Sequence, residues 1–155
     1  MTRWMVLAGL VSVEKITLAC ELADHFVQAG QRVALLDQVA RLPIDSERAP
    51  VPPLRLDPLS VPDLLGLADE VGADVVIYAA SEMLSPEMLI TAVEDLRAAR
   101  PDLVLHSIGL LDLRTCDCFP GVRLALEAWA EQIVHLPYAL DAVLARLPAA
   151  QEKRG

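Results

Sequence analysis

The stretch "WMVLAGLVSVEKITLACELADHFVQAGQRVALLD", residues 4–37, decides the fold class of this 155-residue chain. It opens with a continuous apolar run (4–10), which is typical of a strand buried on both faces of a parallel sheet. Over residues 15–29 apolar side chains recur every three or four positions, which predicts an amphipathic helix, and Gly30 supplies a helix stop. A second buried strand follows at 32–37. Because the joints are short, we expect two parallel strands joined by a right-handed helical crossover.

The same alternation continues along the rest of the chain. Three more buried strands are expected at 73–80, 102–111 and 132–137, and helices at 60–71, 85–100, 121–131 and 140–147. Residues 43–58 contain five prolines and predict a loop, with at most a short edge strand at 54–56. This order predicts an α/β doubly wound sheet, mostly parallel, with helices on both faces. We expect a single domain over 1–148 and a flexible C-terminal tail over 149–155.

Composition excludes some partners and favours others. The chain is 54% hydrophobic, and its mean hydropathy of +0.41 suggests apolar surface that another protein covers. Its net charge of -9 disfavours a protein that holds nucleic acid or an anionic membrane through overall charge. No stretch approaches the roughly 20 apolar residues of a membrane span. Glu14 and Lys15 interrupt the N-terminal apolar run, which disfavours an export signal, so we expect a cytoplasmic protein.

The joint after the first strand, "AGLVSVEKIT" (8–17), is where doubly wound folds bind phosphate, because backbone N–H groups and a helix N-terminus point there. A Walker loop reads G-x-x-x-x-G-K-[ST]: the glycines let the backbone wrap the phosphates, lysine neutralises them, and the hydroxyl holds magnesium. Gly9 and Lys15 fit this pattern. Glu14 replaces the second glycine and Ile16 replaces the hydroxyl residue. The loop therefore predicts a degenerate phosphate site.

Residues 9–37 resemble the opening of the ParA/MinD-type ATPases, the deviant Walker group within the SIMIBI class of P-loop NTPases. Their typical opening is GKGGVGKTTLALNLA, followed by a strand ending in aspartate. Residues 73–115 resemble their Walker-B strand with the helix and strand after it, and "IVHLPYALDAVLARL" (133–147) resembles a segment near their C-terminus. The resemblance implies a shortened P-loop NTPase-like fold, ATP with magnesium as the ligand, and dimers that meet face to face across the nucleotide.

Four positions keep the identities of this family and form the candidate nucleotide site. They are Gly9, Lys15, Thr17 and Asp37. The resemblance implies that Asp37 helps to position magnesium or the attacking water. For Lys15 the plainer alternative is an exposed lysine in the first turn of the helix.

Other positions have lost the chemistry of the family. Leu10 stands where the signature lysine would be, and Ala79 stands at the Walker-B aspartate. Phosphoryl transfer depends almost wholly on such charge-stabilising groups. We therefore predict an inactive ATPase-like protein, without a cofactor, that acts by binding a protein partner as a homodimer or in a hetero-complex. The apolar loop residues Leu10, Val11 and Val13 are expected to make that contact.

Two other functions stay open at this point. The first is a weak nucleotide-binding protein or ATPase of the ParA/MinD type that uses ATP with magnesium. The second is a thiol metal or redox protein, because the thiolates of Cys116 and Cys118 could share a soft metal. Metal motifs usually show C-x-x-C spacing and the chain has no second pair, so we expect two ordinary thiols in a turn.

Overall fold

The computed structural model describes residues 2–114 and 116–148, and it describes Cys116 by its backbone alone. Six strands form one all-parallel sheet in the order β3-β2-β4-β1-β5-β6. The strands are β1 (Arg3–Ala8), β2 (Val33–Asp37), β3 (Leu54–Arg55), β4 (Val75–Ala79), β5 (Val104–Asp112) and β6 (Gln132–Leu136). The predicted doubly wound α/β sheet is confirmed. The predicted tail over 149–155 lies outside the described residues.

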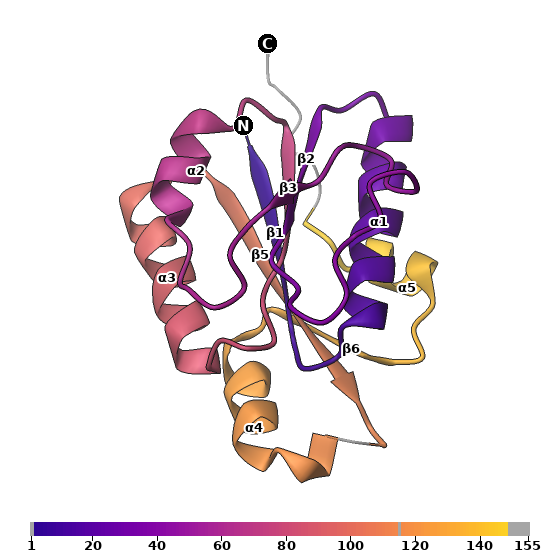
Figure 1. Ribbon diagram of the computed structural model, residues 1–155, viewed down its shortest axis with the longest axis vertical. Helices are drawn as coiled ribbons and strands as arrows, with labels where there is room; N and C mark the ends of the chain where they lie inside the picture. Colours follow the sequence, from indigo (N-terminus) through magenta and orange to yellow (C-terminus); the bar gives the residue numbers. More distant parts are fainter. Residues whose placement is uncertain (1, 115, 149–155) are drawn as a thin grey trace.

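Helices cover both faces of the sheet (Figure 1). One face is covered by α1 (Val13–Gln28) and α5 (Leu140–Ala145), and the other by α2 (Leu64–Glu70), α3 (Pro86–Ala99) and α4 (Pro120–Trp129), which follows the short helix η1 (Cys116–Cys118). No helix in the described part of the chain is long and apolar enough to span a bilayer.

The position of β1 between two layers of helices explains why its sequence is apolar throughout. Met5 and Leu7 pack in the core beneath α1, whereas Trp4, Val6 and Ala8 pack in the core on the opposite face. Successive side chains of a strand point to opposite faces, so a strand covered by helices on both sides needs apolar residues at every position.

The helix expected over 60–71 starts later than predicted. Its N-cap is Asp63, whose carboxylate accepts the N–H of Gly66 at 3.0 Å, and α2 begins at Leu64. Ser85, the first residue of the helix expected over 85–100, caps α3 by accepting the N–H of Met88 at 3.4 Å. The proline-rich segment forms a loop with the short edge strand β3, also as predicted.

Candidate functional site

The carboxyl ends of the parallel strands meet at one edge of the sheet, where α4 lies in Figure 1. The loops that follow β1, β2, β4 and β5 gather there. This is the edge at which ligands bind in doubly wound folds. The candidate nucleotide residues and the predicted contact residues all come from elements that reach this edge.

Lys15 is fully buried, so the exposed first-turn lysine considered from the sequence is wrong. Its Nζ donates hydrogen bonds to the carbonyl oxygens of Gly9 at 2.6 Å and Ala80 at 2.8 Å. Burial lowers the pKa of the ammonium group to about 8, and the negative charge of Glu82 acts in the opposite direction. The ammonium group therefore joins the loop after β1 to the end of β4.

The burial of Lys15 follows from its position on α1. It shares the buried stripe of the helix with Leu18, Ala19, Leu22 and Phe26. These positions recur at the three- and four-residue spacing of a single helix face. The spacing of these positions in the sequence therefore predicts that Lys15 is buried. The charge of the lysine alone would predict an exposed side chain.

Gly9 is required by the path of the backbone. Its φ is +144°, a conformation that L side chains rarely adopt, and a Cβ atom would lie 2.5 Å from the carbonyl oxygen of Leu110 in β5. The loop after β1 therefore passes too close to β5 for any side chain, whether or not a phosphate binds.

Three positions around the start of α1 differ in their surroundings. Thr17 is exposed, and its hydroxyl donates to the carbonyl of Val13 at 2.9 Å, one helical turn back. Ile16 is half-buried against the core beneath α1. The Oγ of Ser12, the N-cap residue, is buried and has no hydrogen-bond partner in the described structure.

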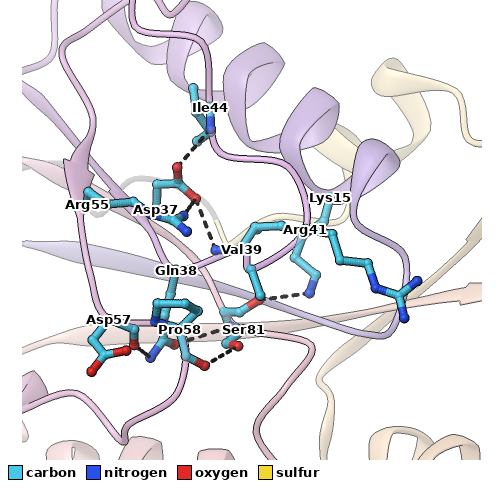
Figure 2. A network of polar contacts seen from close by, with 12 residues as sticks. Lys15, Asp37, Gln38, Val39, Arg41, Ile44, Arg55, Asp57, Pro58 and Ser81 are labelled. Atoms are coloured by element: carbon cyan, nitrogen blue, oxygen red, sulfur yellow. Dashed lines mark hydrogen bonds and ion pairs between the residues drawn. The ribbon is translucent and has the colours of Figure 1, made fainter.

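Asp37 is buried at the end of β2 and serves the loop that follows it (Figure 2). One carboxylate oxygen accepts the N–H of Val39 at 3.0 Å and lies 2.9 Å from Nη1 of Arg55. The other accepts the N–H of Ile44 at 2.8 Å. Both oxygens therefore hold the fold of residues 38–55.

Gln38, the residue after Asp37, is a fully buried polar residue that was not predicted from the sequence. Its Nε2 donates to the carbonyl oxygens of Asp57 at 2.9 Å and Ser60 at 2.8 Å. Its Oε1 accepts the hydroxyl of Tyr78 and the N–H of Ser81, the latter at 3.2 Å. All the donors and acceptors of a buried amide are thus used, which fixes the proline-rich loop against β4.

The loops after β2 and β4 are also joined directly. The hydroxyl of Ser81 donates to the carbonyl of Pro58 at 2.6 Å (Figure 2). One carboxylate oxygen of Glu82 accepts the N–H groups of Ala40 at 2.9 Å and Arg41 at 3.0 Å. These bonds hold the two loops in one arrangement.

Apolar side chains are exposed along the same edge of the sheet. Leu10 is 42% exposed, and Val13, Met83 and Phe119 are between 56% and 57% exposed. Val11 is half-buried, and it lines a cavity together with Leu10, Met83 and Phe119. We call these five residues the apolar edge. Isolated exposed apolar residues are ordinary, but several at the ends of neighbouring strands are typical of a contact surface.

Only one member of the cysteine pair has a described side chain. Cys118 is an exposed free thiol in η1, and the side chain of Cys116 lies outside the described residues. Within the described ranges, no group of three or more histidine, cysteine, aspartate or glutamate residues could hold a metal ion. Cys20 is half-buried and packs against the core beneath α1.

No protein-family model matches the chain, and no curated protein matches its sequence. Solved structures do match its fold. The signal recognition particle receptor FtsY from Elizabethkingia anophelis aligns with a TM-score of 0.62 and 22% identity, over 87% of this chain and 50% of that one. The same receptor in complex with GDP gives a TM-score of 0.58 and 21% identity, over 86% and 48%. The 54 kDa signal recognition particle protein from Aeropyrum pernix K1, also with GDP, gives 0.57 and 18%, over 86% and 35%.

These neighbours are P-loop NTPases of the SIMIBI class, so the chain has a P-loop NTPase-like fold. It spans about half or less of the length of each of them. At such low identity the likeness shows the fold alone. Membership of the ParA/MinD group stays a prediction from the sequence.

Proposed function

We propose that this chain is a P-loop NTPase-like protein that does not hydrolyse nucleotide and acts by binding another protein through its apolar edge. The observation that carries the proposal is the pairing of Lys15. The group that would neutralise a bound phosphate is directed to two carbonyl oxygens of the protein, whereas apolar side chains face solvent beside it.

The chain lacks two of the side-chain groups that P-loop NTPases use for nucleotide hydrolysis. The position of the magnesium-binding hydroxyl holds Ile16, which packs against the core, and the position of the Walker-B carboxylate holds Ala79, which is fully buried. Asp37 keeps its carboxylate, but backbone N–H groups and Arg55 engage both oxygens. A carboxylate used in this way is poorly suited to binding magnesium.

The loops after β2 and β4 support a binding role over a nucleotide switch. In many P-loop proteins these loops change conformation with the γ-phosphate and its magnesium. Here hydrogen bonds of Gln38, Ser81 and Glu82 join the two loops without a bound nucleotide. A surface held in one arrangement lowers the entropy lost on binding a partner.

We expect ATP and GTP with magnesium to bind no tighter than about millimolar, which corresponds to roughly -4 kcal/mol. The lost hydroxyl at Ile16 and the carboxylate at Glu14 both disfavour a magnesium triphosphate. Isothermal titration calorimetry measures this directly. The matched control is Glu14→Gly with Ile16→Thr, which should bind nucleotide better but not hydrolyse it, because Ala79 is unchanged. Micromolar affinity of the wild-type chain would contradict the proposal.

Self-association is the simplest form of the proposed contact. At micromolar concentration we expect light scattering to give about twice the chain mass of 16.8 kDa. Val13→Asp should return the mass to that of one chain, because an unpaired charge in a desolvated contact costs several kcal/mol. Val27→Asp is the matched control, since Val27 is exposed at the other end of α1.

A single-chain mass for the wild type would reject the homodimer and restrict the proposal to a hetero-complex. An equal effect of Val27→Asp would place the contact away from the apolar edge.

Weak nucleotide binding is the second candidate function, and one observation favours it. The Oγ of Ser12 is buried without a partner at the N-cap of α1, the position from which a hydroxyl and the helix N-terminus can both face an anion. The calorimetric experiment above decides between this candidate and the inactive protein.

A further inference from the structure

A cavity of about 240 Å³ opens at the carboxyl ends of β1 and β5 beside α4. Its walls are mostly apolar, and they come from the loops after β1, β2 and β4, from the end of β5 and from α4. They include Leu10, Val11, Met83, Phe119, Val122 and Leu126. Concave, mostly apolar cavities with a few polar groups are the usual form of small-molecule sites.

Three of the four charged residues that line the cavity have partners in the protein. Asp112 pairs with Arg114 at 3.1 Å, and Arg123 pairs with Glu127 at 2.6 Å. Backbone N–H groups hold one oxygen of Glu82, whereas its other oxygen, Oε2, is buried and has no hydrogen-bond partner in the described structure. Asp112 and Arg123 are therefore engaged within the protein, and Glu82 is engaged through one of its two oxygens.

The fourth charged residue, Arg41, differs from them. Its backbone N–H pairs with Glu82, but its guanidinium forms no hydrogen bond or ion pair within residues 2–114 and 116–148. Figure 2 shows the guanidinium extending away from the network around Gln38 and Ser81. A guanidinium offers five N–H donors in a plane that matches the oxygens of a carboxylate or sulfonate.

We propose that this cavity binds a small organic anion, with an aromatic or branched apolar body between Leu10 and α4 and its acidic group against Arg41. The apolar walls supply binding energy through burial, and Arg41 supplies selectivity for an anion. The proposal goes beyond the protein contact and does not rest on it, because the cavity exists within one chain, although Leu10, Val11, Met83 and Phe119 belong to both the cavity and the apolar edge.

Two fluorescent dyes with the same ring system test this proposal. 8-Anilinonaphthalene-1-sulfonate is an apolar anion, and N-phenyl-1-naphthylamine is the same scaffold without the sulfonate. We expect saturable binding of the anion at one site per chain. Arg41→Gln should weaken the anion about tenfold and leave the neutral dye unchanged. Arg48→Gln is the control, because Arg48 is an exposed arginine of the same loop that pairs with Asp45 and does not line the cavity.

Filling the cavity locates the dye. Val122→Trp, or Met83→Trp if the first variant fails to fold by circular dichroism, should reduce the binding of both dyes. The proposal is overturned if the sulfonate dye shows no saturable binding, if Arg41→Gln does not change its affinity, or if the folded tryptophan variant binds as the wild type does. None of these results would alter the light-scattering test of the protein contact.

Discussion

The free energy of unfolding of the wild-type chain should include a rise of about 3 kcal/mol between pH 8 and pH 10.5 that comes from Lys15. Burial lowers the pKa of this amine to about 8 in the folded chain, against 10.5 in the unfolded chain. Between these values the unfolded state binds a proton that the folded state does not, so stability increases with pH. Below pH 8 both states are protonated, and above pH 10.5 both are neutral, so this contribution is then constant.

Urea unfolding across this pH range measures the effect, with Lys15→Met as the reference. Methionine keeps the apolar stem and removes the titrating group, so the rise should appear in the difference between the two proteins. Burial raises the pKa of Tyr78, which lowers stability above about pH 10, but this contribution is common to both proteins and cancels. A difference that does not change with pH would contradict the burial of the Lys15 ammonium.

The two hydrogen bonds of Lys15 have a consequence for the function of the loop. Without them the carbonyl oxygens of Gly9 and Ala80 would lose the donor they have in the folded chain. The lysine therefore has a structural role that does not need a phosphate. Its presence in a degenerate Walker loop gives little support to nucleotide binding.

The fold could be predicted because its signals are local. The apolar run of β1 and the spacing on α1 each follow from the geometry of a single element between two packed layers. The short connection at Gly30 then predicts that β1 and β2 are parallel and are joined by a right-handed crossover through α1. The start of α2 at Leu64, later than the expected residue 60, was missed because Ser60 and Asp63 are both residue types that cap helices, and only the path of the preceding loop decides between them.

The polar contacts of the site could be predicted less well, because their partners come from distant parts of the chain. Asp37 was singled out by its place at a strand end, but Arg55 lies on another strand. Gln38 carried no signal, because its hydrogen bonds to the carbonyl oxygens of Asp57 and Ser60 depend on the course of the proline-rich loop. Every residue has a backbone carbonyl, so a hydrogen bond to one does not require a particular residue type and cannot be predicted from the sequence.

Gly9→Ala should be the most destabilising small substitution in the loop, at about 3 kcal/mol or more. Two costs add at this position. The φ of +144° is strained for alanine, and the new methyl group would meet the carbonyl oxygen of Leu110 at 2.5 Å. Because that atom belongs to the backbone of β5, no rotation of a side chain can relieve the contact. Chemical denaturation gives the loss directly.

Gly30→Ala separates the two costs. Gly30 also has a positive φ, +82°, but nothing lies within 4 Å of the position that a Cβ atom would take. Alanine there should cost only about 1 kcal/mol, the usual penalty of the left-handed conformation. If both variants lose the same stability, the close approach to β5 is not what requires glycine at position 9. If Gly9→Ala loses the larger amount, the two loop residues that still match the Walker pattern, Gly9 and Lys15, are both explained by packing and hydrogen bonding within the protein, and neither argues for a bound phosphate.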